Sequence, residues 1–446
     1  MAKHYRITFE CYESTANPEI SLSKTALISG VIDKPVDIFT FGLAHEEQIK
    51  LIQLSQDALL KEQVSSINSE EYCPNCPGKK LVKYGRRHSN YHDVFTDHKI
   101  TIGRKRCLEC GHEPGSTIQN ILGHSMSADL IRLQSELGSD YPYRESQRLL
   151  SIFSRTAREI NNHDRIKSTT EKIGANVEMI YQTEGEVVAI KPAEKLVLNV
   201  DGGHINTIEE GKRSFEAMTA VIYQPGALVS NKAGTRNHLT SKHCSASALS
   251  DNQQQMINNT IIAALKQGLS PQTEVTALCD GADNCWQVVA ALKPLAASMI
   301  CILDWFHLGM KIQNIALPEE LKAKLLRVKW HLWRGKVDNA LIRLAALIIA
   351  CPQLDRQRLE KLQIYLINNR NKIVDYRKRQ KDGLVFTSNL AEATVESLIN
   401  RRCKGQQHMR WSRKGLNPVL QLRAAMSSND WDKNWKTAVM NAVVRN

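Results

Sequence analysis

The stretch KLVLNVDGG, residues 195–203, decides the fold class: an apolar run ends in Asp201 and two glycines follow it. Three more stretches share this compact apolar character, namely FEAMTAVIY (215–223), TEVTALCD (273–280) and SMICILD (298–304). Short apolar runs bounded by polar turns are typical of buried strands. Helical patterns at 253–267 and 285–292 separate the later runs, so the sequence predicts a mixed α/β sheet.

Three of these predicted strands end in a carboxylate: Asp201, Asp280 and Asp304. Two carboxylates at neighbouring strand ends repel each other unless a cation is bound between them, and Mg²⁺ prefers such hard oxygen ligands. Alternatively, each Asp caps the helix that follows. A third ligand would be Glu396 or Glu392, which lie one turn apart on a predicted helix. Spacing alone decides neither this choice nor that between Asp280 and Asp304.

Two cysteine pairs predict a metal site. Cys73 with Cys76 and Cys107 with Cys110 have CxxC spacing and are separated by 30 residues. Such pairs fit a closed, tetrahedral, structural zinc site, and Gly111 provides the backbone freedom that the second turn favours. The chain has eleven cysteines, and this odd number argues against a disulfide framework.

Positive charge is concentrated in two segments of a chain whose net charge is +13. Residues 79–106 hold nine Lys or Arg against two Asp, and residues 401–424 hold seven and no acidic residue. Such patches suit DNA, although a solvated charged face is the alternative. Trp411 is a candidate to stack on an unpaired base, whereas we expect Trp330 and Trp333 to be core residues. The candidate DNA contacts are Arg86, Arg87, Arg104, Lys105, Arg106, Arg401, Arg402, Lys404, Arg410, Trp411, Arg413 and Lys414.

We expect six segments along the chain. Residues 1–70 have no assigned role, but they open with an alternating, strand-like segment around 5–9 and continue into a polar, helix-like stretch at 46–62. Residues 71–116 form a zinc ribbon with the cysteine pairs on short strands. Residues 117–185 form short helices, with Ser127 as a plausible N-cap. Within the helical segment a helix-turn-helix is possible, with Arg155, Arg158, Arg165 and Lys167 on or near its second helix. Residues 186–308 form the first part of the α/β core, 309–385 a helical insertion, and 386–446 the last part of the core with a basic tail.

Several function classes are disfavoured. No stretch approaches the roughly 20 apolar residues of a membrane span, so we expect no membrane partner. The first residues, MAKHYRITFECYES, lack the pattern of a signal peptide, so we expect a reducing, cytoplasmic location with association to the nucleoid. No His-Glu-x-x-His motif is present, which excludes that class of zinc protease.

The order of these motifs resembles the DDE transposases of bacterial insertion sequences. The resemblance covers residues 70–425 and rests on Asp201-Gly-Gly-His, Asp280-Gly-Ala, Asp304-Trp-Phe-His307, the helical insertion, VESLINRR (395–402) and HMRWS (408–412). It is closest to the Kra-type family, with zinc-ribbon and Mutator-like transposases behind it. The approach to Glu396 lacks the expected glycines, which leaves Glu392 open.

The resemblance implies an RNase H-like catalytic core with Asp201, Asp280 and Glu396 as the triad, Mg²⁺ or Mn²⁺ as cofactor, and His307 as a supporting residue. It further implies cleavage at terminal inverted repeats, strand transfer into target DNA, and a homo-oligomer on double-stranded DNA. Two alternatives remain at this level: a catalytically inactive zinc-ribbon DNA-binding regulator, and an RNase H-like nuclease without strand transfer.

Overall fold

The computed structural model describes residues 3–13, 20–32, 38, 41–67, 70–183, 191–230, 237–351, 353–388, 394–404 and 409–444. The chain divides into two compact units: unit 1 comprises Met1–Thr170 with Val439–Asn446, and unit 2 comprises Glu171–Ala438. Within the described ranges, no helix has both the length and the apolar character that crossing a bilayer requires.

Unit 1 begins with an antiparallel hairpin of β1 (Lys3–Glu13) and β2 (Ile20–Ile32), followed by the long helix α1 (His45–Ser66). Extended structure around residues 5–9 and a helix over 46–62 are predicted from the sequence, and both are confirmed. β2 is not among the elements expected from the sequence, although Ser21 and Ser23 alternate with apolar residues at its start.

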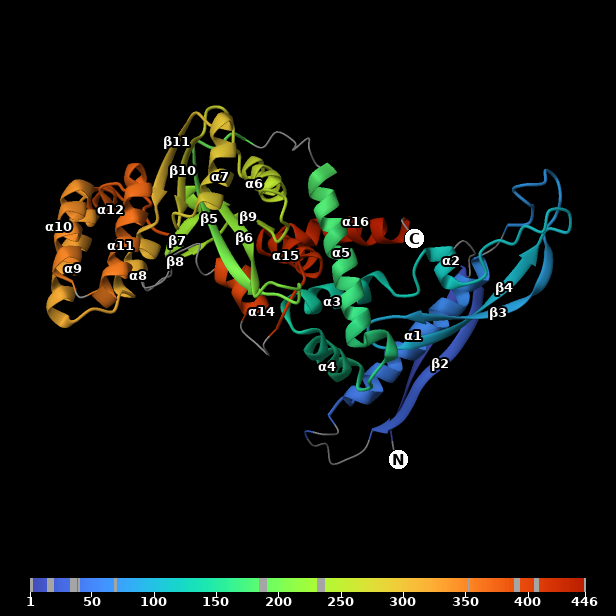
Figure 1. The fold of residues 1–446 in the computed structure, drawn as a ribbon. Coiled ribbons are helices and arrows are strands. Elements are labelled where there is room, and N and C mark those ends of the chain that lie inside the picture. The colour runs from blue at the N-terminus through green and yellow to red at the C-terminus, as the bar shows by residue number, and fades with distance from the viewer. Residues whose placement is uncertain are drawn as a thin grey trace. The chain divides into compact units, whose positions relative to one another are not determined.

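The basic segment between the cysteine pairs is itself an antiparallel hairpin, β3 (Val82–His92) with β4 (Asp97–Arg106) (Figure 1). The prediction that the cysteines lie on short strands is therefore wrong, since they lie in the turns and loops before β3 and after β4. Residues along β4 are alternately exposed and buried. Ile100 and Ile102 pack with Ile118 of α2 (Ile118–Leu122) and with Leu60 of α1.

Three helices follow, α3 (Ala128–Asp140), α4 (Tyr143–Ser154) and α5 (His163–Thr183). Ser127 is the N-cap of α3 and its hydroxyl accepts a hydrogen bond of 3.1 Å from the Leu130 amide, as the sequence predicts. α4 ends at Arg155, which adopts a left-handed φ of 56°.

The centre of unit 2 is a five-stranded mixed sheet with the order β11-β10-β5-β6-β9 (Figure 1). Its strands are β5 (Lys195–Asn206), β6 (Ser214–Tyr223), β9 (His243–Ser247), β10 (Glu274–Cys279) and β11 (Ser298–Leu303). β5, β10 and β11 are parallel, whereas β6 is antiparallel to β5 and β9 is antiparallel to β6. A short hairpin of β7 (Leu228–Ser230) and β8 (Asn237–Leu239) forms a separate ladder.

The two faces of the sheet pack against different helices. Leu196, Leu198 and Val200 of β5 share a core with residues of α6 (Gln254–Lys266) and α7 (Asp283–Leu292). Val197 lies in the opposite core, which includes residues of α8 (Trp305–Gln313) and α15 (Arg413–Ser427). Because side chains alternate along a strand, Asn199 and Asp201 lie on the Val197 face.

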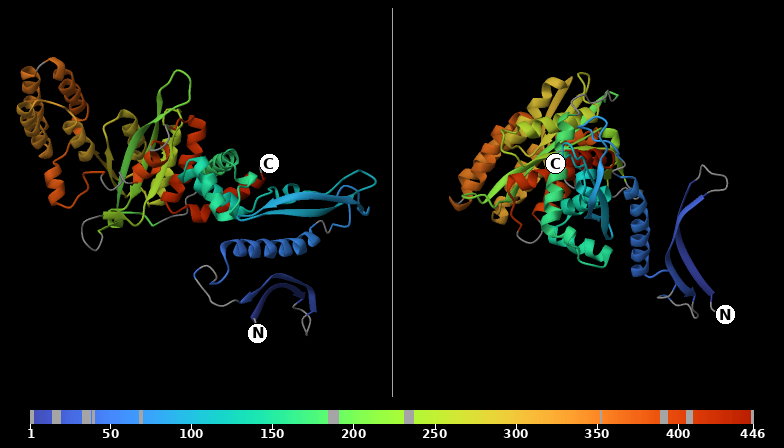
Figure 2. Two further views of the ribbon diagram at one scale, coloured as in Figure 1. Left: turned by 90° about the horizontal axis from the view of Figure 1, so that it is seen from below. Right: turned by 90° about the vertical axis from the view of Figure 1, so that its right-hand side faces the viewer.

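Between β11 and residue 385 the described residues form helices and no strand: after α8 come α9 (Glu319–Trp333), α10 (Val337–Ala350), α11 (Gln353–Asn368) and α12 (Tyr376–Lys381). They gather beyond the β11 edge of the sheet (Figures 1 and 2). Trp333 packs against Trp305 at a centroid distance of 4.8 Å. The prediction that Trp330 is a core residue is wrong, since it is 59% exposed.

The C-terminal part of unit 2 returns to the sheet. A π-helical segment, η5 (Glu396–Asn400), runs directly into α14 (Arg401–Cys403). α15 then packs against β9, and α16 (Trp431–Val444) follows it. The return brings the segment after residue 394 onto the sheet face that carries Asp201, since Val395, Leu398 and Ile399 belong to the same core as Val197.

Candidate functional site

Three aspartates lie side by side where the apolar runs of three parallel strands of the unit 2 sheet end. The parallel register aligns the ends of the apolar runs of β5, β10 and β11, so the residues that follow occupy adjacent positions. These residues are Asp201, Asp280 and Asp304. The sequence predicts three strand ends, and the strand order makes them neighbours.

A small pocket joins these carboxylates. Its volume of about 10 Å³ is close to the lower limit for one water molecule. His307 and Ser388 contribute to its wall beside the three aspartates. Val395 also lines the pocket, but its neighbour Glu396 does not. The remaining lining residues are Asn199, Val200, Leu278 and Cys279.

Asp201 is half-buried, and its desolvation raises its pKa above the ordinary value. The positive charges of His307 and Lys404 oppose this shift, while the negative charge of Asp280 adds to it. One carboxylate oxygen accepts a 2.8 Å hydrogen bond from the Gly202 amide. A carboxylate whose pKa is raised by burial and by a second carboxylate is stabilised by a bound cation.

Asp304 has very different surroundings. Its carboxylate accepts hydrogen bonds from the amide and hydroxyl of Ser388, at 2.7 and 2.8 Å, and from the His307 amide at 3.1 Å. The His307 ring nitrogen Nδ1 also lies 2.7 Å from it. Burial alone would raise the pKa of Asp304, but the bonds and charge of His307, with help from Ser388, lower it. Asp304 thus caps α8 and orients His307, as the capping alternative expects.

Asp280 is held at the start of a turn by the helical segment. Its side chain accepts a 2.9 Å hydrogen bond from the Ala282 amide, and its backbone carbonyl accepts one of 2.5 Å from the Tyr365 hydroxyl. Gly281 adopts a left-handed φ of 98°, and an added Cβ there would lie 2.7 Å from the Tyr365 ring. Glycine is therefore required by both conformation and space. In this way α11 fixes the turn that presents Asp280.

Glu396 is exposed and begins the π-helical segment, where its carboxylate accepts a hydrogen bond from the Asn400 amide. The buried Arg423 donates to the carbonyls of Ser397 and Leu398 within this segment. π-helical turns are uncommon and concentrate at functional sites. Glu392, the alternative, lies outside the described residues.

The structure does not bring the proposed triad together as a compact ligand group. Among the described residues, the cysteines form the one group of three or more His, Cys, Asp or Glu whose ligand atoms all lie within 4.8 Å of one another. Asp201 and Asp280 lie next to each other on the sheet, while Glu396 projects from a neighbouring segment.

Asn199 is a site residue that the sequence reasoning missed. It is 2% exposed, it lines the pocket, and neither its side-chain nitrogen nor its oxygen has a hydrogen-bond partner among the described residues. The Tyr223 hydroxyl is close to this amide without forming a well-oriented hydrogen bond with it. A polar residue two positions before Asp201 in an apolar strand could have identified it, since both then point to the same face.

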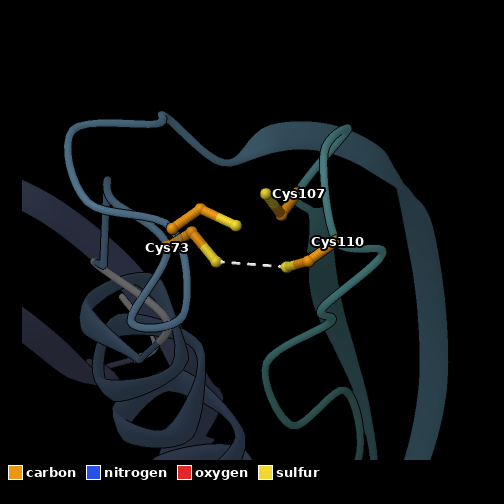
Figure 3. Close-up of side chains that lie close together, drawn as sticks. Cys73, Cys107 and Cys110 are labelled. Atoms are coloured by element: carbon orange, nitrogen blue, oxygen red, sulfur yellow. Dashed lines mark hydrogen bonds between the residues drawn. The ribbon is translucent and has the colours of Figure 1, made fainter.

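Cys73, Cys76, Cys107 and Cys110 form a cluster compatible with a zinc ribbon. Figure 3 shows the sulfurs of Cys73 and Cys110 facing each other from two loops, 3.6 Å apart. Four sulfurs at the usual ~2.3 Å from a tetrahedral zinc would be about 3.8 Å apart, so the cluster has the right size. Gly78, two residues after Cys76, and Gly111, directly after Cys110, both have a φ of 73°. His112 remains outside this cluster.

Backbone amides in the second turn stabilise a thiolate. The Cys110 amide, with that of Glu109, lowers the pKa of Cys107 to about 7. Cys76 is affected in the opposite direction, because its contact with the Cys110 thiol raises its pKa to about 12. A bound zinc ion would hold all four as thiolates.

The candidate DNA contacts differ widely in exposure. Arg86 and Arg87 on β3 are exposed, and so are Arg401, Lys404, Arg410 and Lys414 in unit 2. Arg104, Lys105 and Arg106 are half-buried, and Arg104 pairs with Glu113 at 2.7 Å. Lys404 extends over Gly203 and acts on Asp201.

Three of the candidate DNA contacts need revision. Arg402 and Trp411 are 1% and 6% exposed, with the guanidinium 4.8 Å from the ring centroid, so this pair belongs to the core of unit 2. Trp411 therefore presents no face for a base to stack on. Arg413 is also largely structural, since it donates to the Ala248 carbonyl at 2.8 Å and covers the Phe215 ring.

One of the four cations expected on or near the possible helix-turn-helix, Arg158, is buried and cannot contact DNA. Arg158 is 7% exposed and binds the turn between β3 and β4, donating to the carbonyls of Asp93, Val94 and Thr96. It also pairs with Asp97 at 2.5 Å. Arg155, Arg165 and Lys167 are exposed. Arg158 is thus a structural residue that ties the helices of unit 1 to its hairpin.

A scan against models of protein families finds no family that matches this chain, and a search of curated proteins finds no matching sequence.

Proposed function

We propose that the chain is a DDE-type transposase that binds the ends of an insertion sequence and catalyses metal-dependent DNA cleavage and strand transfer. The observation that carries this proposal is the adjacency of Asp201 and Asp280 at the ends of neighbouring parallel strands. The helical return after residue 394 packs on the same sheet face and carries Glu396.

The topology of unit 2 supports an RNase H-like core. Numbered in chain order within this sheet, the strands lie as 5-4-1-2-3, with antiparallel pairing among the first three and parallel pairing of strands 1, 4 and 5. Helices α6 and α7 fill the connections to the two later parallel strands. An all-helical stretch separates the second Asp from the Glu, as the resemblance to DDE transposases implies.

The donor set fits Mg²⁺ or Mn²⁺. Asp201 and Asp280 supply hard oxygen ligands, and the Asn199 amide in the same pocket lacks a partner among the described residues. When bound, the metal would supply charge neutralisation and a more acidic water at the phosphodiester. Asp304 holds His307 beside Asp201, where a protonated imidazole would lower the pKa of Asp201. Glu396 joins this site if its side chain turns from Asn400 toward the pocket that Val395 lines.

The remaining parts of the chain suit DNA. We infer that the cysteine cluster holds a structural zinc and that the exposed cations of β3 and of the 401–414 segment contact the phosphate backbone. The expected partners are terminal inverted repeats and target DNA. Because two transposon ends must be joined, we expect a homo-oligomer on DNA, acting in the cytoplasm at the nucleoid.

The test uses purified full-length protein with a labelled duplex that carries the sequences flanking its gene, in Mg²⁺ or Mn²⁺. We expect nicking and end joining by the wild type, and loss of both with retained binding in Asp201→Asn, Asp280→Asn and Glu396→Gln. Glu360→Gln, an exposed residue of α11, is the matched control and should behave as wild type.

Three results would contradict the proposal in distinct ways. Nicking without joined products would indicate a nuclease. Tight specific binding without any cleavage would indicate a regulator. Full activity of Glu396→Gln would remove Glu396 from the triad and direct attention to Glu392.

A further inference from the structure

Unit 1 contains a large groove between α1 and the β3–β4 hairpin, which run alongside each other (Figure 2). Its volume is about 1180 Å³, against about 10 Å³ for the pocket at the carboxylates. α1 forms one wall and includes Lys61, while the hairpin forms the other. The groove thus has a volume far larger than that of a water site, and it extends along both α1 and the hairpin.

Cations dominate the walls of this groove. Six Lys or Arg residues line it, namely Lys61, Lys83, Arg86, Lys99, Arg104 and Lys105. Its two acidic residues are already paired: Asp57 lies 2.6 Å from a ring nitrogen of His98, and Asp97 binds Arg158. The groove therefore presents an excess of positive charge that these carboxylates do not neutralise.

The cations also repel one another. Lys83 and Lys105 are direct cross-strand partners in the hairpin, and like charges in that position destabilise a sheet. The Lys105 amine donates a hydrogen bond to the backbone carbonyl of Glu70. Because this acceptor is uncharged, the positive charge of Lys105 is not neutralised. A bound polyanion would relieve this repulsion.

Two glycines open the hairpin wall. An added Cβ at Gly85 or Gly103 would meet no atom within 4 Å, and both residues line the groove, so the hairpin wall is uncrowded at these positions. Both strands of a two-stranded hairpin are edge strands, and backbone amides are good donors to phosphate oxygens. Closely spaced cations on an uncrowded strand are suited to a phosphodiester chain.

We propose that this groove binds one sugar-phosphate backbone of double-stranded DNA, with α1 as a wall of the binding site. The inference rests on the proposed function and extends it, because it gives a role to a helix in the N-terminal 70 residues and adds Lys61, Lys83 and Lys99 to the contact surface.

The test compares two lysines of the same helix in the full-length protein. Lys61 lines the groove, whereas Lys50 is exposed and does not. Fluorescence anisotropy with a labelled duplex at several salt concentrations gives the affinity and its salt dependence. We expect Lys61→Ala to weaken binding severalfold and to lower the slope of log K against log salt by about 1. Lys50→Ala should leave both unchanged.

A second pair of variants changes the charge at the groove wall. Gly103 has a negative φ and open space at its Cβ, so Gly103→Glu adds a carboxylate at a residue of the groove wall without steric conflict, and Gly103→Ser is the neutral control. We expect at least a tenfold loss of affinity for Gly103→Glu and near wild-type binding for Gly103→Ser. Unchanged zinc content and circular dichroism would show that both variants fold.

The outcomes separate this inference from the proposed function. If Lys61→Ala and Gly103→Glu bind DNA as wild type does, while Asp280→Asn abolishes cleavage, the groove assignment fails and the transposase proposal stands. If both variants lose binding but the wild type cleaves no DNA, the groove assignment stands and the catalytic proposal fails. Stronger binding of a single strand than of a duplex of equal length would overturn the choice of duplex DNA.

Discussion

Asp304 and Asp280 follow equivalent strand ends, yet their side chains have different tasks. Four donors from Ser388 and His307 surround the Asp304 carboxylate, which leaves little capacity for a metal ion. Asp280 accepts one hydrogen bond, from the Ala282 amide. Hydrogen-bond satisfaction therefore favours Asp280 as the metal ligand and Asp304 as a positioning residue, a choice that sequence spacing leaves open.

This difference predicts unequal effects of two conservative changes. Asp304→Asn retains the cap of α8 but weakens the orientation of His307, so we expect cleavage to fall about 10-fold to 100-fold, as for other residues that orient a site. Asp280→Asn should abolish detectable cleavage. Single-turnover rates across a pH series would check this, with an altered pH profile expected for Asp304→Asn. Equal losses without such an alteration would contradict it.

Burial explains which residue assignments the sequence could not provide. Trp411 and Arg402 lie in a segment rich in cations, and the sequence does not show that both side chains are buried. Their burial results from tertiary packing. Arg158 is likewise hidden by a turn more than sixty residues away in the chain. By contrast, the four cysteines could be grouped from spacing, because each CxxC turn is local.

At the scale of elements, apolar runs and helical spacing predict β5, β6, β10, β11, α1, α6 and α7, and the structure confirms these. β9 is missed because its sequence, HCSAS, has small and polar residues in place of an apolar run. Its burial is provided by α6 and α15 on either side. The strand order also depends on such distant contacts, which a single sequence does not display.

The contact between α1 and the β3–β4 hairpin should depend on pH through His98. This side chain is buried between Asp57, at 2.6 Å, and Asp93, at 3.0 Å. Burial alone would lower the pKa of His98, but the bonds and charges of both carboxylates raise it above its ordinary value. Protonated His98 therefore stabilises the folded state fully below about pH 6.5, the pKa of histidine in an unfolded chain. This stabilisation is lost as the pH rises through the raised pKa of His98 in the folded state.

Thermal unfolding of the full chain at pH 6 and pH 8 measures this effect. We expect the midpoint temperature of unfolding to decrease from pH 6 to pH 8 by more in the wild type than in His98→Gln, because glutamine cannot be protonated. Asp93 has a lowered pKa, so its contribution is present above about pH 4 and does not change across this range. An equal shift in both proteins would contradict the role of His98.

At the scale of the whole molecule, the division into two units predicts separable responses to metal. The cysteine cluster lies in unit 1 and the carboxylates lie in unit 2. Removal of zinc by a strong chelator should unfold the ribbon, because its two turns are joined through the thiolates. We expect about one zinc per chain and loss of hydrogen-exchange protection in 71–110, with protection of β5 and β10 unchanged. Zinc-free protein with full protection in 71–110 would contradict a structural zinc.

The central claim, that Asp201 and Asp280 hold a catalytic divalent metal, is tested most directly by exchanging the ligand chemistry. Mg²⁺ accepts oxygen ligands, whereas Mn²⁺ tolerates a thiolate better. We predict that Asp280→Cys is inactive in DNA cleavage with Mg²⁺ and regains activity with Mn²⁺, while Asp304→Cys shows no such metal-dependent rescue. Rescue of Asp304→Cys in place of Asp280→Cys, or full activity of Asp280→Cys with Mg²⁺, would contradict the assignment.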